Sequence, residues 1–150
     1  MTRRRIRRRA PIVGLVTVTL LLTGCASGTA TTRDSGFAGV VQRPPLHRPA
    51  FALTDTAGRP YDFAARTRGT LTLLYFGYTR CPTECPTTLA TVASALRGMP
   101  AAQRQQVTLV LVSTDPARDT RPVLREYLHR FDPAFVGLTG TPAQVAAAER

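Results

Sequence analysis

Two apolar runs with a helical pattern between them constrain the fold of this chain most strongly. Residues 70–76 and residues 107–112 are rich in β-branched and aromatic side chains and are nearly continuous in apolar character. Such runs are typical of strands buried on both faces. Between them, apolar residues recur at helical spacing from Leu89 to Leu96, and the pattern stops at Gly98. The order strand, helix, strand predicts a right-handed crossover and a parallel pair of strands.

Further elements are expected on both sides of this unit. Apolar and polar residues alternate at 51–54 and 61–63, on either side of the turn-forming residues 55–60, which predicts a hairpin. A second helical stripe covers residues 123–131. Thr141 and Pro142 are typical of an N-cap and a first helical position, so a last helix is expected through the final residues of the sequence. The predicted class is α/β.

The first 24 residues are expected to be a lipoprotein signal peptide. Arginines crowd positions 3–9, and the apolar run that follows at residues 12–22 is too short to span a bilayer as a helix. The run ends in Gly24-Cys25, which resembles the lipobox of bacterial lipoproteins, where the cysteine is diacylated and anchors the protein to the membrane. An ordinary cleaved signal or an uncleaved anchor is the alternative. The arginine-rich start is compatible with export by the general secretory route and by the twin-arginine route.

The rest of the chain divides into a tether and one domain. Residues 25–49 are small, polar or proline-rich, which predicts a flexible tether that carries a solvated His47. Residues 50–150 leave room for a single domain. The formal net charge is +11, but six of the twenty basic residues lie in the first nine positions. The remaining basic residues are scattered and lack interleaved aromatics, which argues against nucleic-acid binding.

A pair of cysteines is the main candidate for chemistry. Cys81 and Cys85 lie four apart between the first long strand and its helix, so both are expected on one helix face, able to bind one ion or to form a disulfide. The helix N-terminus and Arg80 favour a thiolate, more so at Cys81. Thiolates are soft ligands that select Cu(I). A structural disulfide or half of a zinc site is the alternative.

The sequence around these cysteines resembles the signature of the SCO/SenC family. The matching string is FGYTRCPTECPTTL at residues 76–89, with further matches at residues 53–58, 113–120 and 131–140. The resemblance implies a thioredoxin-like, three-layer α/β/α domain on the outer face of the cytoplasmic membrane, held there by the lipid anchor. It also implies that this domain binds copper, as Cu(I) or Cu(II), and helps to load the dinuclear copper site of cytochrome c oxidase.

The resemblance also implies roles for individual residues. Cys81 and Cys85 match the family's copper ligands and redox cysteines. Asp115 and Asp119 match acidic positions that we expect to shape the loop beside the site rather than to bind metal. The family's third ligand is a histidine in a later segment, and no residue of this sequence matches it. We expect His129 to be an exposed helical residue.

The match with the family also ends before the domain is complete. The expected domain lacks the closing β-hairpin and the last helix of a thioredoxin fold, as a shortened gene product would. The strand at residues 71–76 should then have an open, apolar edge, and the monomer should be marginally stable.

Three functions follow from this reading. The first is a metallochaperone that transfers Cu(I) to the copper-bearing subunit of cytochrome c oxidase by ligand exchange. The second is a thiol-disulfide reductase acting on the cysteines of that subunit, with Cys81 as nucleophile and Cys85 as resolving cysteine. Three residues between the cysteines suit a metal chelate better than a dedicated reductase. The third is an inactive truncated remnant.

Overall fold

The computed structural model describes residue 40 and residues 42–150. The predicted signal peptide, the predicted lipid site at Cys25 and the predicted tether as far as residue 39 lie outside the described residues. The elements are β1 (Ala52–Asp55), β2 (Pro60–Asp62), α1 (Phe63–Arg66), β3 (Leu71–Gly77), α2 (Glu84–Arg97), α3 (Ala101–Arg104), β4 (Val107–Ser113), α4 (Arg121–His129), β5 (Val136–Thr139) and α5 (Pro142–Ala148).

These strands form one mixed sheet in the order β2-β1-β5-β4-β3. The predicted hairpin is confirmed, because β1 and β2 pair antiparallel with Leu53 opposite Tyr61. The predicted parallel pair is confirmed as well, because β3 and β4 pair in parallel along their whole length. Strand β5 lies between the two pairs, parallel to β4 and antiparallel to β1.

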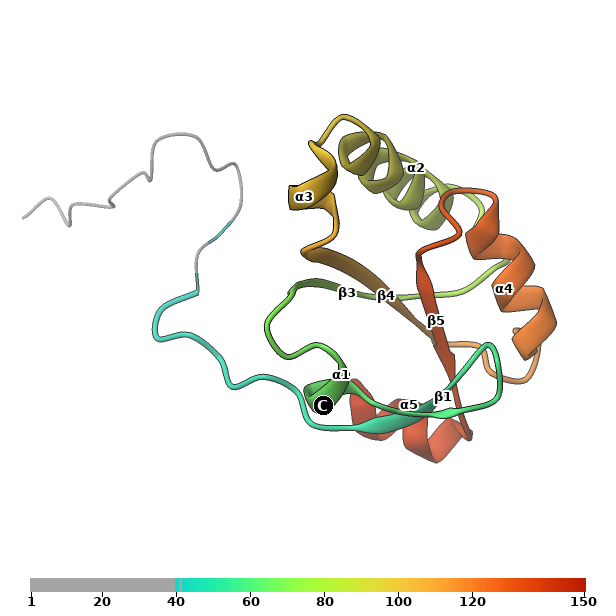
Figure 1. The fold of residues 1–150 in the computed structure, drawn as a ribbon. Helices are drawn as coiled ribbons and strands as arrows, with labels where there is room; N and C mark the ends of the chain where they lie inside the picture. The colour runs from blue at the N-terminus through green and yellow to red at the C-terminus, as the bar shows by residue number, and fades with distance from the viewer. Residues whose placement is uncertain (1–39, 41) are drawn as a thin grey trace, which may run out of the picture. The chain divides into compact units, whose positions relative to one another are not determined.

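Helices cover both faces of the sheet, which confirms the three-layer α/β/α arrangement (Figure 1). Strand β4 divides the core: Leu109 and Leu111 point to one face, Val110 and Val112 to the other, as the two-residue period of a strand requires. The first face packs against α2 and α4. The second packs against α5 and the residues that follow β2. The core residues are Leu89, Ala93, Leu96, Leu124, Tyr127, Leu128 and Phe135 on the first side, and Leu53, Tyr61, Phe63, Leu138, Val145 and Ala148 on the second.

Strand β3 lies at the edge of the sheet, where β4 is its single partner among the described residues. The open, apolar edge is therefore as predicted. The prediction that β3 is buried on both faces was wrong. Leu71 is 62% exposed and Leu73 is 37% exposed, because no strand covers the outer side of β3 in the described part of the chain. Strand β4 lies inside the sheet and is buried as predicted: Val110, Leu111 and Val112 are fully enclosed.

The last helix begins at the predicted residue. The Thr141 hydroxyl accepts a hydrogen bond from the Gln144 N–H, and the Gln144 side chain accepts one from the Thr141 N–H. This capping box, with Pro142 in the first turn, satisfies two donors that a helix start leaves free. Val145 and Ala148 on the same helix are buried against the sheet.

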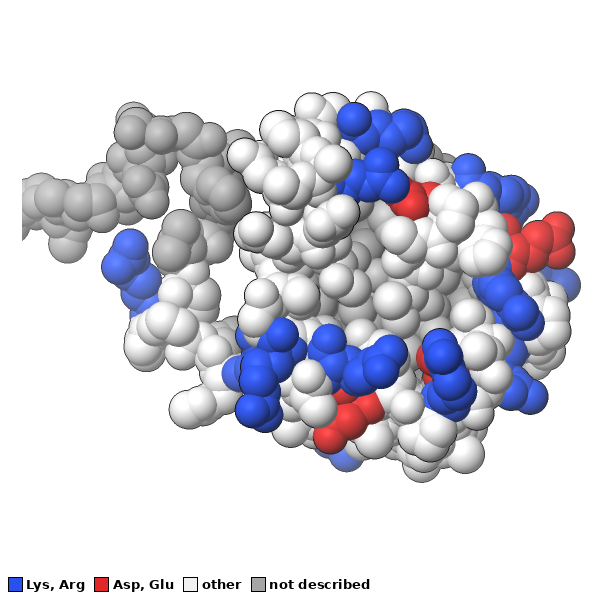
Figure 2. Space-filling model, in the orientation of Figure 1, with Lys and Arg blue, Asp and Glu red and all other residues white. Residues whose placement is uncertain are grey.

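Charged side chains are dispersed over the surface. On the face shown in Figure 2, arginines form separate groups along the rim with acidic residues among them, and a central area carries no charge. Among the described residues no helix is long and apolar enough to cross a bilayer.

Candidate functional site

The two cysteines lie together where β3 leads into α2. The Cys85 backbone N–H donates a hydrogen bond to the Cys81 sulfur at 3.2 Å, and both residues are free thiols. Cys81 is half-buried, whereas Cys85 is 4% exposed. The sequence placed both cysteines at the start of the helix, but α2 begins at Glu84, so that Cys81 lies in the preceding loop. The pair still forms one site, because the first turn of α2 points its N–H groups back at Cys81.

The two thiols differ in acidity. Hydrogen bonds from the Cys85 side chain and the Cys85 backbone N–H lower the pKa of Cys81. Burial raises the pKa of Cys85, and hydrogen bonding with Cys81 raises that pKa further. The predicted preference for a thiolate at Cys81 therefore agrees with the geometry. Its main cause is the hydrogen bonding from Cys85 rather than the charge of Arg80.

This asymmetry predicts the order in which the thiols react with an alkylating reagent. As pH rises, Cys81 loses its proton below the pH at which an ordinary thiol does, whereas buried Cys85 loses its proton above it. Iodoacetamide should modify Cys81 first, with a pH midpoint below that of a free thiol, and Cys85 more slowly. Peptide mass spectrometry across a pH series measures both rates. Urea-unfolded protein is the control and should show equal rates; equal rates in the folded protein would contradict the prediction.

Gly77 leaves room for the Cys85 sulfur at the end of β3. A Cβ at this position would lie 2.9 Å from Tyr75 Cε1, closer than such atoms approach, and 3.0 Å from Cys85 Sγ, which is an unusually tight contact. We expect Gly77→Ala to lower the free energy of unfolding by about 1–3 kcal/mol, because overpacking displaces a buried side chain. Urea denaturation measures this change.

Gly98→Ala provides the control for that substitution. A Cβ at Gly98 meets atoms no nearer than 3.5 Å, so this change should leave stability nearly unaltered. Similar losses in the two variants would show that the space at Gly77 is unimportant.

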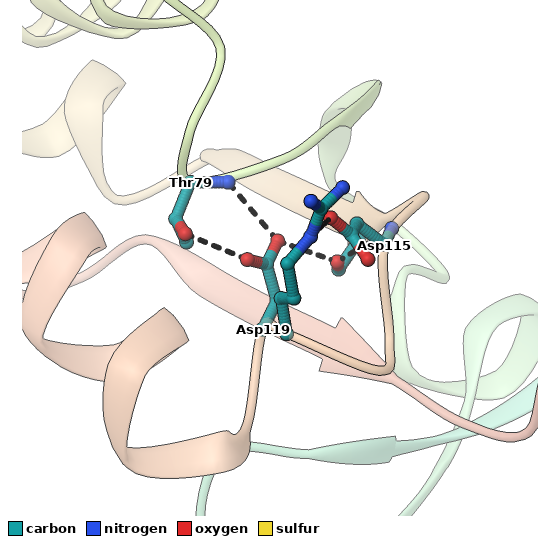
Figure 3. Close-up of polar contacts among 5 residues, drawn as sticks. Thr79, Asp115 and Asp119 are labelled. Atoms are coloured by element: carbon teal, nitrogen blue, oxygen red, sulfur yellow. Dashed lines mark hydrogen bonds and ion pairs between the residues drawn. The ribbon is translucent and has the colours of Figure 1, made fainter.

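A buried carboxylate holds the loop that carries Cys81 (Figure 3). Asp119 is fully buried and accepts hydrogen bonds from the Thr79 N–H at 3.0 Å and the Thr79 hydroxyl at 2.6 Å. It also accepts one from the buried Ser113 hydroxyl at 2.7 Å. Thr79 is two residues before Cys81, while Ser113 ends β4. Asp119 thus ties the cysteine loop to the end of the neighbouring strand.

Asp115 lies in the same loop but in a more open position. Its carboxylate pairs with Arg118, and its backbone N–H donates to the Ser113 hydroxyl at 3.1 Å. The Thr114 N–H also donates to the Gly77 carbonyl at 2.9 Å, so the two loops are joined by backbone as well. Both predicted acidic residues therefore lie beside the cysteine loop. Asp119 makes the direct contact with it.

The two histidines are distant from the cysteines in the sequence, and both are exposed. His129 is exposed at the end of α4, and His47 is exposed before β1. Within the described residues no cluster of three or more histidine, cysteine or acidic side chains could hold a metal ion. Among the described residues, the two neighbouring sulfurs of Cys81 and Cys85 are therefore the candidate ligands.

Sequence reasoning missed Tyr75, which lies beside the Cys85 sulfur at the end of β3, and Tyr127 in the core cluster. Hydrogen bonding with Cys85, followed by burial, raises the pKa of Tyr75. Tyr127 of α4 is buried in the same core cluster, against which Tyr75 packs. The two-residue period of β3 could have predicted that Tyr75 lies on the side of the sheet covered by α2. The position of Tyr127 depends on how α4 packs and has no local signal.

A mixed sheet covered by helices on both faces, with two neighbouring cysteines where β3 leads into α2, defines a thioredoxin-like domain. The SCO1/SenC family model matches residues 40–150, and the chain belongs to this family. Among curated proteins, it is 40% identical over 95 residues to Protein SCO2 of Saccharomyces cerevisiae mitochondria, covering 63% of this chain and 31% of that protein. It is also 40% identical over 100 residues to Protein SenC of Rhodobacter capsulatus, covering 61% and 45%.

Solved structures agree with this assignment. Bradyrhizobium japonicum ScoI with copper bound is 38% identical, with a TM-score of 0.62, and the match covers 69% of this chain and 64% of that one. Apo Sco1 of Thermus thermophilus is also 38% identical, with a TM-score of 0.63, covering 69% and 60%. BsSco, described as a member of the Sco family of cytochrome c oxidase assembly proteins, shares the fold at 20% identity. The chain spans about half or less of the length of the curated relatives it matches.

Proposed function

We propose that this protein binds Cu(I) through Cys81 and Cys85 and transfers it to the copper-bearing subunit of cytochrome c oxidase. The observation that carries the proposal is the contact between half-buried Cys81 in the loop before α2 and buried Cys85 in the first turn of that helix, both free thiols. Relatives from Bradyrhizobium japonicum and Saccharomyces cerevisiae have been solved with copper bound, which supports the choice of metal.

The chemistry of the pair suits a soft cation that must be released again. Cu(I) prefers thiolate sulfur, and the lowered pKa of Cys81 favours the thiolate at that residue. A thiol that binds the metal as a thiolate releases its proton to solvent. Two sulfurs leave room for an incoming ligand, so a thiolate or imidazole of the receiving site can join the copper before Cys81 or Cys85 leaves it.

We also propose how the chain presents this site. Residues 1–24 direct export, a lipid on Cys25 anchors the protein to the outer face of the cytoplasmic membrane, and residues 25–49 tether the domain at residues 50–150. A lipid anchor with a flexible tether would allow the domain to search the membrane surface for a membrane-bound partner. Metabolic labelling with a palmitate analogue tests the anchor: label is expected on the wild type and absent from Cys25→Ser.

A transfer assay tests the chaperone function. The Cu(I)-loaded protein is mixed anaerobically with the copper-free, reduced copper-bearing subunit, the two are separated, and the copper content of each is measured. Copper should move to the subunit. The control is the Cys81→Ser, Cys85→Ser double variant supplied with the same total Cu(I). Retention of copper by the protein, or equal delivery by the control, would contradict the proposal.

A thiol-disulfide reductase is the second candidate, favoured by the half-buried, acidic thiol of Cys81 backed by a buried second thiol. The Cys81 thiolate would attack a substrate disulfide and release one substrate thiolate, which takes up a proton. Cys85 would lose its proton and attack the Cys81 sulfur, releasing the second substrate thiol. The products are a reduced substrate and a Cys81–Cys85 disulfide. Reduction of the oxidised subunit by metal-free protein, without copper transfer in the preceding assay, would favour this function.

A further inference from the structure

The outer side of β3 presents unpaired backbone groups. The Leu71 N–H donates to the Gln106 carbonyl at 2.8 Å, so Leu71 directs its backbone groups at β4. Backbone groups of successive residues in a strand point to opposite sides, and every second residue of β3 therefore directs its N–H and C=O groups outward. These outward residues are Thr72, Leu74 and Phe76. Within residues 42–150 no strand pairs with this side of β3.

Both faces of the sheet are apolar along this edge. Leu71 and Leu73 lie on one face and are 62% and 37% exposed. Leu74 and Phe76 lie on the other face, where they pack against the buried core while remaining partly exposed. A strand that paired with β3 would therefore cover apolar side chains on both of its faces.

The two edges of the sheet differ in their protection. Edge strands are commonly protected from further pairing by a proline or a charged side chain. Strand β2, at the opposite edge, carries both, as exposed Pro60 and Asp62. Strand β3 carries neither, and no charged residue occurs from residue 69 to residue 79. Strand β3 is therefore the edge that is open to a further strand.

Positive charge flanks this uncharged segment at both ends. Arg68 precedes it and Arg80 follows it, and both side chains are exposed. Neither forms an ion pair with another described residue. The uncharged central area of Figure 2 lies where Figure 1 shows β3 and β4, and arginines lie along its rim. A strand beside β3 would thus meet apolar surface along its length and positive charge at its ends.

A second copy of this chain does not match that charge pattern. Antiparallel pairing of two copies about Leu74, the midpoint of β3, would place Arg68 opposite Arg80 of the second copy. Like charges directly opposite each other destabilise a pair of strands. A strand with acidic residues at both ends would instead meet an arginine without an ion-pair partner at each end, whichever direction it ran.

We propose that the outer edge of β3 binds an extended segment of another protein, with apolar and β-branched residues over about seven positions and acidic residues at both ends. The segment adds to the sheet as a further strand, which is an established mode of peptide recognition. Its backbone pairs with the outward N–H and C=O groups, and its side chains cover Leu71 and Leu73. The cysteines take no part, so the proposal does not rest on copper binding.

Two labelled peptides test this site on the reduced, metal-free full chain. The probe EEVTVTVTVEE has the proposed charge pattern, and KKVTVTVTVKK has the reverse. Fluorescence anisotropy at low salt should show the acidic peptide binding about tenfold or more tightly than the lysine peptide. The difference should shrink as added salt screens the charges. Equal binding of the two peptides, or no binding of the acidic one, would overturn the proposal.

Thr72→Pro separates strand pairing from general attraction between charges. Proline removes an N–H that points outward, so the pairing of β3 with β4 is kept. The variant should retain the wild-type circular dichroism spectrum and bind the acidic peptide about tenfold or more weakly, because the hydrogen bonds across the new strand pair are interrupted. Wild-type affinity in the folded variant would show that the peptide does not pair with β3.

Charge reversal at the two ends of β3 gives a second test, which does not depend on a proline. Arg68→Glu, Arg80→Glu should reverse the preference, so that the lysine peptide binds more tightly than the acidic one. The matched control is Arg43→Glu, Arg125→Glu, which changes the net charge equally at two exposed positions outside β3 and its flanking residues. It should keep the preference for the acidic peptide. An unchanged preference in the first variant, or a reversed one in the control, would contradict the proposal.

Analytical ultracentrifugation of the wild type tests the alternative occupant. The full chain should show no dimer that depends on β3. A concentration-dependent dimer that Thr72→Pro abolishes would show that a second copy takes this edge, and the proposal of an acidic partner segment would then be wrong.

Discussion

Replacing either Cys81 or Cys85 with serine is expected to abolish tight Cu(I) binding. A hydroxyl group is a hard, protonated donor at neutral pH and cannot replace a thiolate on a soft cation. Because the described residues offer no cluster that could compensate, we expect each single variant to lose affinity by about a thousandfold or more. Anaerobic titration against a competing Cu(I) chelator measures the loss.

The two serine variants should differ in stability. Cys81 is half-buried, so its replacement should have little effect on unfolding. Cys85 is 4% exposed, and a serine there buries a hydroxyl in an apolar position, which should cost about 1–3 kcal/mol. Cys25→Ser is the control for affinity, since this cysteine belongs to the proposed anchor. Wild-type affinity in either Cys81→Ser or Cys85→Ser would exclude the dithiol as the copper site.

Asp119→Ala is expected to be the most destabilising substitution near the site. Asp119 is fully buried and accepts three hydrogen bonds, two from Thr79 and one from Ser113. Alanine leaves three donors without an acceptor, two on half-buried Thr79 and one on buried Ser113, so we expect the free energy of unfolding to fall by about 3 kcal/mol or more. Cu(I) affinity should fall as well, because the loop that carries Cys81 is no longer held to the end of β4.

Asp115→Ala is the matched comparison. Asp115 lies in the same loop, but its carboxylate pairs with Arg118, an exposed side chain, and such pairs contribute about 0–1 kcal/mol. Urea denaturation of both variants separates the two roles. If Asp115→Ala destabilised the protein as much as Asp119→Ala, the hydrogen bonds to the cysteine loop would not explain the effect.

The elements with strong periodic patterns were predictable from the sequence. Strands β3 and β4, helix α2 and the capping box of α5 each have a local signal in apolar spacing or in capping residues. Strand β5 was missed because its four residues include Gly137 and its pairing with β1 and β4 is tertiary. The exposure of β3 also depends on the order of strands in the sheet, which local sequence does not specify.

In the site, too, some features have a local sequence signal and others depend on tertiary packing. The spacing of Cys81 and Cys85 predicted that their sulfurs could meet, but not that Cys81 lies outside the helix and receives its hydrogen bond from the Cys85 N–H. The contact between Asp119 and Thr79 joins residues 40 apart in the sequence and exists only once β3 and β4 have paired. The unpaired hydroxyl of Tyr127 likewise follows from packing between helix and sheet.

Copper K-edge X-ray absorption of the Cu(I)-loaded protein tests the proposed copper site most directly, because it identifies the atoms bound to the metal. The wild type should bind one copper per chain with two sulfur neighbours, and the Cys81→Ser, Cys85→Ser double variant should show none. Copper bound through nitrogen or oxygen alone, or the same spectrum from both proteins, would contradict the assignment of Cys81 and Cys85 as the ligands.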